Sequence, residues 1–134
     1  MNERILKIEE VTDFQFEGSD MYEYFDGFWI TTDRQVIKIG IRNNQCCCED
    51  WGYFISEDEI KKFIGAKLLK ITETNINLIT EEIRALRNSD CETLFINFET
   101  NKGTLQFVAY NAHNGYYGHE AILSSEQLNI KEML

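Results

Sequence analysis

The chain has 134 residues, with 23 acidic and 13 basic side chains and a formal net charge of −10 at pH 7. A chain of this length can bury its own core, so we expect a single domain over residues 1–134. The acidic charge repels phosphate backbones and argues against direct nucleic-acid binding; it suits either simple solubility or docking onto a basic protein surface. The N-terminus has no apolar signal segment and no apolar run approaches the ~18 residues of a membrane span, so we expect a cytoplasmic protein without membrane contact.

Two strands are predicted between residues 21 and 42, separated by a turn at residues 32–34. Apolar and other residues alternate along the second strand, which is the pattern of a strand with one buried face. The residues expected to face the core are Ile37, Ile39 and Ile41.

A short helix is predicted over residues 56–65. Ser56 can cap its N-terminus with Glu59 as the capping-box partner, and Gly65 can end it in a left-handed conformation. A strand over residues 66–74 follows, and residues 78–90 indicate a second short helix or a helical loop.

Residues 91–110 carry the clearest strand signal, because apolar residues alternate on both sides of a turn at Asn101-Lys102-Gly103. This pattern predicts an antiparallel hairpin. Another strand is expected at residues 117–124, and a short helix at residues 124–134. The predicted fold class is therefore α+β, with a mainly antiparallel sheet of about six or seven strands and one or two short helices.

Three consecutive cysteines, Cys46, Cys47 and Cys48, precede an aromatic segment, and Cys91 is distant from them. A disulfide between neighbouring cysteines is strained, and disulfides are rare in the cytosol, so consecutive thiols indicate a metal or redox site. The alternative is that these residues pack as small apolar side chains. Alternation along a strand would put Cys47 on the face opposite its neighbours, so packing alone explains three in a row poorly.

The two histidines of the chain, His113 and His119, lie in "NAHNGYYGHE", residues 111–120. If Asn114-Gly115 forms a two-residue hairpin turn, Tyr110 faces His119 across the hairpin. The two imidazoles then lie on opposite faces, and one metal ion cannot bind both. A bulge at Gly118 would reverse that arrangement, because it adds one residue to the strand.

Structural zinc takes four ligands, drawn mainly from thiolate and imidazole groups, and this chain offers both. The spacing differs from that of zinc fingers, so the residue types carry this hypothesis. We therefore expect a structural zinc ion with ligands drawn from Cys46, Cys47, Cys48, His113 and His119.

The segments "CCCEDWGYF", "IGAKLLKI" and "FVAYNAHNGYYGHEAIL" together resemble an uncharacterised domain of bacteriophages and prophages. Its members pair a Cys-Cys motif and a following aromatic with a later Asn-Gly-Tyr-Tyr-Gly segment. The resemblance covers roughly residues 28–124 and matches Cys47 and Cys48 to the cysteine pair. Cys46 is an extra residue here, and His119 falls where other members often have a different residue. The chain is also similar to small acidic phage proteins that block host defence, the type II-A anti-CRISPR proteins that bind Cas9.

This second resemblance implies a zinc-stabilised protein that is not an enzyme and that binds and inhibits a basic host nuclease, Cas9, in the host cytoplasm. The alternative is a zinc-binding structural domain of unknown phage function. Acidic residues could contact the basic partner, although they could equally form a solvated face and a helix N-terminus. They are Glu17, Asp20, Glu23, Asp26, Glu57, Asp58 and Glu59.

Two chemical functions are weaker hypotheses. A zinc hydrolase would need an open coordination position and a base such as Glu49 or Glu120, but the chain has none of the H-E-x-x-H, deaminase or nucleophile-elbow motifs. A thiol redox function would lack the two-residue spacer that separates the paired cysteines of a redox motif.

Overall fold

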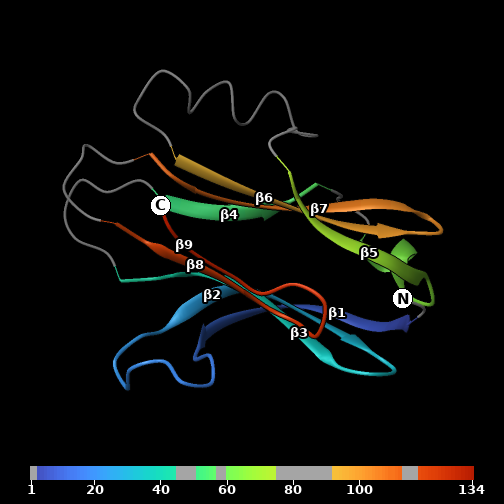
Figure 1. The fold of residues 1–134 in the computed structure, drawn as a ribbon, viewed down its shortest axis with the longest axis horizontal. Helices are drawn as coiled ribbons and strands as arrows, with labels where there is room; N and C mark the ends of the chain where they lie inside the picture. The colour runs from blue at the N-terminus through green and yellow to red at the C-terminus, as the bar shows by residue number, and fades with distance from the viewer. Residues whose placement is uncertain (1–2, 45–50, 57–59, 75–91, 113–117) are drawn as a thin grey trace.

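The computed structural model describes residues 3–44, 51–56, 60–74, 92–112 and 118–134. In this part of the chain, two layers of antiparallel strands face each other (Figure 1). The strands follow the order β4-β7-β6-β5-β1-β2-β3-β8-β9. Their bounds are β1 Glu3–Phe14, β2 Phe25–Thr32, β3 Val36–Arg42, β4 Trp51–Ile55, β5 Lys67–Thr74, β6 Glu92–Thr100, β7 Gly103–Asn111, β8 Glu120–Ser124 and β9 Ile130–Met133, and a 3-10 turn, η1, spans Ile60–Phe63.

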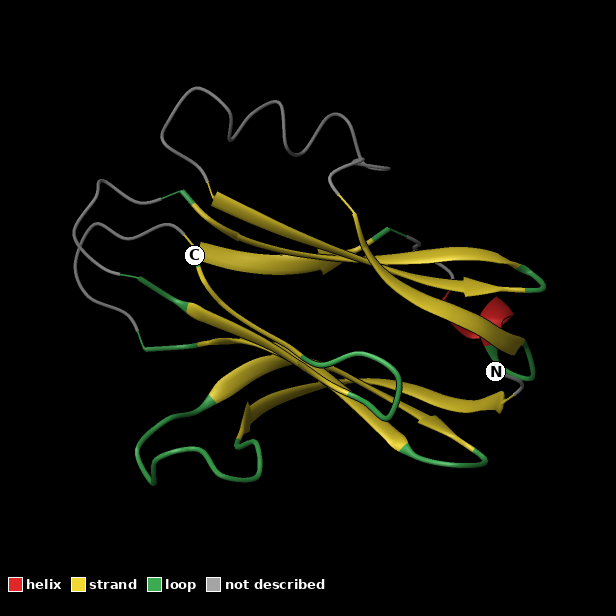
Figure 2. Ribbon diagram, viewed as in Figure 1, coloured by secondary structure: helices red, strands yellow, loops and turns green. Residues whose placement is uncertain are grey.

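One layer contains β4, β7, β6 and β5, and the other contains β1, β2, β3, β8 and β9 (Figure 2). The two layers are joined at one corner, where β1 pairs with β5 through Glu3 with Leu68 and Arg4 with Lys67. This joint is short, so the layers are held together mainly by what they bury between them.

The main core fills the space between the layers. Phe28 of β2 packs edge-on against Phe107 of β7, with ring centroids 6.1 Å apart, and against Tyr53 of β4 at 5.9 Å. The three residues expected to face the core, Ile37, Ile39 and Ile41, are confirmed as buried. Alternating apolar residues of the predicted hairpin are buried in the same core: Leu94, Ile96, Phe98, Leu105, Phe107 and Ala109. Burial of this apolar area is the dominant stabilising contribution to such a fold.

A second aromatic cluster covers the outer face of the second layer, where Phe14, Phe16 and Phe25 pack together. A glycine on β3 makes room for it. Gly27 and Gly40 are paired across β2 and β3, and a Cβ on Gly40 would lie 2.8 Å from the ring of Phe14. The ring therefore lies directly on the strand, and this contact fixes where the chain leaves β1.

The predicted α+β fold class is wrong. The described residues form nine strands and no α-helix. Two of the missed strands, β1 and β4, belong to parts of the sequence for which no element was predicted. β1 contains register shifts and Asp13 has a φ of 53°, so its polar and apolar residues do not alternate regularly.

The helix predicted over residues 56–65 is replaced by the short turn η1. The Ser56 hydroxyl accepts a hydrogen bond of 2.9 Å from the backbone N–H of Gln106 on β7, so it serves the sheet. Gly65 does adopt a positive φ, of 82°, as its predicted stop role requires. Glu57, Asp58 and Glu59 lie outside the described residues.

The helix predicted over residues 124–134 is also wrong, because this segment turns back and forms β9 against β8. The Ser125 hydroxyl bonds the backbone of Leu128, and the Asn129 side chain accepts from the Ser125 N–H. These local bonds satisfy the backbone in a turn, which removes the advantage of a helix. The helix predicted at residues 78–90 lies outside the described residues.

Candidate functional site

His119 is a buried residue at one end of the two layers, just before β8. Its backbone pairs with Leu134 through two hydrogen bonds of 2.9 Å, which continue the β8–β9 ladder. Its imidazole Nδ1 lies 2.8 Å from the backbone oxygen of Arg42, and its ring stacks on Trp51 with centroids 5.2 Å apart. The side chain is thus fixed from both sides.

The contact with Arg42 determines the tautomer. A carbonyl oxygen can only accept, so Nδ1 carries the proton and donates it. In the neutral ring Nε2 is then the nitrogen that carries the lone pair, and a backbone carbonyl bonded to the other nitrogen is the usual support of a metal-binding histidine.

The residues that contact His119 are those that flank the cysteine run. Arg42 is the last residue of β3 and Trp51 is the first residue of β4, so residues 43–50 connect two neighbours of the same imidazole. Asn111 pairs with Trp51, and the segment that contains His113 starts there. His119 also pairs with Leu134, and in Figure 1 the strand β4 begins beside the C-terminus.

The other predicted zinc ligands, Cys46, Cys47, Cys48 and His113, lie outside the described residues, as does Glu49. Within the described part of the chain, no group of three or more His, Cys, Asp or Glu side chains is placed to hold a metal ion. His119 is therefore the one predicted ligand whose position can be stated.

The hairpin interpretation of residues 111–120 is wrong. β7 pairs with β6 and β4, whereas β8 pairs with β3 and β9, so the connection between them crosses from one layer to the other. Tyr110 lies opposite Gly52 and Thr93 instead of His119. Because residues 111–120 do not form a hairpin, the two imidazoles need not lie on opposite faces of one strand pair. The predicted bulge at Gly118 is then not required for both histidines to bind one metal ion.

Glu120, one candidate base for a hydrolase, follows His119 directly. Neighbouring residues of a strand point to opposite faces, and Glu120 forms an ion pair of 3.9 Å with Lys131 on β9. Its carboxylate is thus directed away from the imidazole, which makes it a poor base for chemistry at that ring.

A second candidate site is the acidic loop, which we define as residues 15–26. Glu17 and Asp20 are exposed and Glu23 is partly exposed. Asp26 has a different position, since its carboxylate accepts hydrogen bonds from the N–H of Asp13, at 2.9 Å, and from the Asn43 side chain, also at 2.9 Å. Asp26 therefore holds the base of the loop.

Three large apolar side chains of the acidic loop face solvent, and the sequence interpretation missed them. Tyr22 is 82% exposed, Met21 70% and Tyr24 43%. Single exposed apolar residues are common, but several in one short segment indicate an interaction surface. The signal that could have found them was the interleaving of aromatic and acidic residues in "DMYEYFD".

The backbone of the acidic loop is pinned at several points. The Gln15 side chain donates to the carbonyl oxygens of Asp20 and Met21, at 3.4 and 2.9 Å. The N–H of Asn43 bonds the carbonyl of Tyr24 at 3.0 Å, and Phe16 is anchored in the outer aromatic cluster. These bonds hold the backbone of the loop in place, and a preordered backbone lowers the entropic cost of any binding through the loop.

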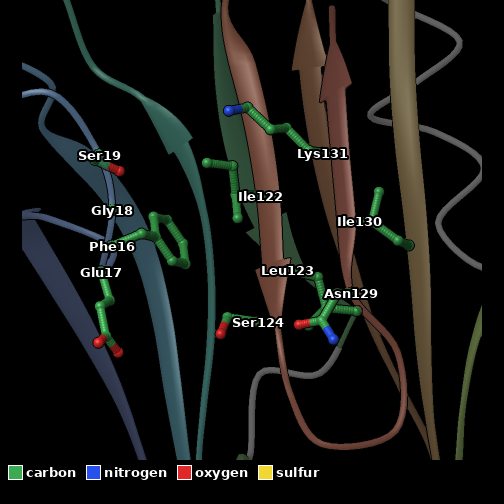
Figure 3. A pocket seen from close by; sticks show the side chains of 10 residues that line it. All are labelled: Phe16, Glu17, Gly18, Ser19, Ile122, Leu123, Ser124, Asn129, Ile130 and Lys131. Atoms are coloured by element: carbon green, nitrogen blue, oxygen red, sulfur yellow. The ribbon is translucent and has the colours of Figure 1, made fainter.

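A cavity of about 290 Å³ adjoins the acidic loop and separates it from β8 and β9 (Figure 3). Phe16 and Ile122 supply apolar walls, and Glu17 and Lys131 lie toward opposite ends of the close-up view. This volume is at the lower end of the range for small-molecule sites, so it fits a single side chain or a small ligand.

Two ionisable groups of the sheets have displaced pKa values. The pKa of Tyr53 is raised above its usual value, first by burial and then by the hydrogen bond that its hydroxyl donates to Glu10. The pKa of Glu132 is also raised, first by burial and then by the charge of Glu73, to which it is hydrogen-bonded, with a smaller contribution from Glu92. Neither group lies in the cavity or the acidic loop.

The described residues contain no helix that is long and apolar enough to span a membrane.

The site features define a small, strand-built acidic domain with an exposed aromatic loop and a buried histidine at one end. The chain belongs to the family described as a domain of unknown function, DUF7448, whose profile matches residues 1–123. The expectation of an uncharacterised domain family is confirmed to that extent. No curated protein and no solved structure matches the chain.

Proposed function

We propose that this chain is a protein-binding domain that docks through its acidic loop onto a basic surface of its partner. The observation that carries the proposal is the exposure of Met21, Tyr22 and Tyr24 on a pinned loop that also presents Glu17 and Asp20. Tyrosines are enriched among the residues that dominate binding energy, and acidic neighbours steer a basic partner and fix its register.

The charge distribution supports the same partner chemistry. Every charged residue between Lys7 and Arg34 is acidic, and the acidic loop lies within that stretch. Such a one-sign surface accelerates association with a positive partner at low salt and loses that advantage at high salt.

A Cas9-type nuclease is the specific partner that we propose, on the resemblance to anti-CRISPR proteins, and binding instead of catalysis is the proposed activity. The test is binding of the purified chain to a type II-A Cas9 by biolayer interferometry across a salt series. Tyr22→Ala should weaken binding by about 30-fold or more if Tyr22 dominates the interface. Leu69→Ala is the matched control, because Leu69 is an exposed apolar residue on β5 in the other layer.

The outcomes separate the two parts of this proposal. If the chain does not bind Cas9, the specific partner is wrong. If it binds Cas9 and Tyr22→Ala leaves the affinity unchanged, the acidic loop is not the docking surface.

We also propose a structural zinc ion beside His119. His119 would bind it through Nε2, with the remaining ligands drawn from Cys46, Cys47, Cys48 and His113. The support is the fixed, buried imidazole with its Nδ1 proton on Arg42, between the residues that flank the cysteine run. Zinc bound in this way would stabilise the fold without doing chemistry.

Metal analysis of the purified protein tests the zinc proposal. Wild-type protein should carry about one zinc per chain, as expected for one four-ligand site. Cys47→Ser and His113→Ala should each lower the zinc content, whereas Cys91→Ser is the matched cysteine control. A wild-type protein purified without zinc and unable to take it up would refute the proposal.

A further inference from the structure

We infer that the cavity beside the acidic loop receives an arginine side chain of the binding partner. The inference rests on the proposed protein-binding function and adds the chemistry of the central contact. The cavity lies between Gly18 and Ser19 of the loop and the β8–β9 pair, so it adjoins the same loop that presents Met21 and Tyr22 to solvent.

The walls of the cavity match the two halves of an arginine side chain. Phe16 and Ile122 offer apolar surface for the aliphatic stem, and Phe16 is already held in place by the outer aromatic cluster. Long cationic side chains bury their stems on such surfaces while the charged head reaches polar groups.

The rim supplies acceptors for the guanidinium. Glu17 is exposed at one end of the view in Figure 3, and the side chains of Ser19 and Ser124 also line the cavity. Asn129 lines it too, but its amide oxygen already accepts a hydrogen bond from the Ser125 N–H. A guanidinium has five donors in a planar fork, so it can use a carboxylate and neutral acceptors together, which a lysine ammonium matches less well.

The cation that lines the cavity, Lys131, does not oppose this assignment. Its ammonium is paired with Glu120 at 3.9 Å, and in Figure 3 it lies toward the end away from Glu17. Asp20 and Glu23 belong to the same loop as Glu17 and add to its negative charge.

The test uses N-acetyl-arginine-N-methylamide as the probe and the citrulline analogue as its uncharged control. In a ¹⁵N-labelled sample of the full chain, the arginine probe should shift the amide signals of Gly18, Ser19, Leu123 and Ser124. The dissociation constant should be on the order of 1 mM, as expected for a ligand of this size. The citrulline probe should bind at least about threefold more weakly, because it lacks the charge.

Two variants locate the site. Glu17→Gln should weaken the arginine probe about three- to tenfold, whereas Glu99→Gln, which removes the same charge from β6 in the other layer, should not. Ser124→Phe should fill the cavity and abolish binding. Val36→Phe places the same ring at an exposed strand position outside the cavity and should leave binding unchanged.

The inference would be overturned if the two probes bound equally, or if the shifted amide signals lay outside the cavity. The absence of any shift at about 20 mM probe, well above the expected dissociation constant, would also overturn it. These results are separable from the proposed function. If Tyr22→Ala abolishes binding of the protein partner while Ser124→Phe does not, the loop is the docking surface and the cavity is not part of it.

Discussion

Replacement of His119 by phenylalanine separates the structural role of the imidazole from metal binding. Phenylalanine keeps an aromatic ring beside Trp51, whose centroid lies 5.2 Å from that of His119. It removes the donor to the Arg42 carbonyl, which is 2.8 Å from Nδ1. His119 is fully buried, so the unsatisfied carbonyl should cost about 1–3 kcal/mol of stability.

The metal-free proteins give the first measurement. For a domain of this size about 1 kcal/mol corresponds to roughly 4 °C in Tm, so His119→Phe should lower the Tm by roughly 4–12 °C in the presence of a chelator. The assay is thermal unfolding followed by circular dichroism. An unchanged or higher Tm would refute the view that the imidazole supports the end of β3.

Added zinc gives the second measurement. A ligand that binds only the folded protein adds about 4 kcal/mol of stability at a thousandfold excess over its Kd. Wild-type protein should therefore gain thermal stability on zinc addition, and His119→Phe should gain much less. An equal gain in both proteins would mean that zinc binds without His119.

Three further predictions concern the sheets and their ionisable groups. Gly27→Ala should destabilise the fold by about 3 kcal/mol or more, because its Cβ would lie 1.9 Å from the Ile39 oxygen. Gly18→Ala has open space but a φ of 85°, so it should cost only about 1 kcal/mol. Equal urea midpoints for the two variants would contradict this contrast. Tyr53 should ionise at a higher pH than an ordinary tyrosine in an alkaline absorbance titration, because its pKa is raised by burial and by Glu10, and Tyr53→Phe should remove that late step. Glu132→Gln should raise the Tm at neutral pH slightly, by less than about 1 kcal/mol in stability at this exposed site. The pKa of Glu132 is raised in the folded state, so its ionisation destabilises the folded protein above that pKa, and the gain of the variant should vanish as the pH falls to ~4. A gain that grows on acidification would refute this assignment.

The sequence predicted the strands whose alternating apolar residues face the main core, although β6 and β7 also bury Phe95 and Val108 on their other face. The alternation of apolar and other residues correctly identified the strands in residues 36–42 and 92–111, because both strands of each pair lie in the middle of a layer. It failed at β1, where two register shifts disturb the two-residue period. The pattern also failed to predict β9, because its four residues are too few to show an alternation that differs from the helix-like composition around them.

The candidate site was predicted in its residue types but not in its topology. An Asn-Gly pair favours a hairpin locally, yet the strands on either side belong to different layers. Local turn chemistry cannot reveal this, because the pairing partners of β7 and β8 are distant in sequence. The contact of His119 with Arg42 spans 77 positions, and no local pattern encodes it.

The two candidate sites are coupled through adjacent residues at the end of β3. Arg42 accepts the hydrogen bond of His119, while Asn43 bonds the Tyr24 carbonyl and donates through its side chain to Asp13 and Asp26 at the base of the acidic loop. Loss of the His119 contact therefore releases the strand end that pins the loop.

We accordingly expect His119→Phe to weaken binding of the protein partner although it changes no residue of the loop. The expected loss is smaller than that of Tyr22→Ala, because the loop retains its Gln15 bonds and its Phe16 anchor. A folded His119→Phe protein that binds its partner as tightly as wild type would show that the histidine end and the acidic loop are independent. If chelator-treated wild-type protein still binds its partner tightly while His119→Phe does not, the coupling lies in the Arg42 hydrogen bond and not in the metal.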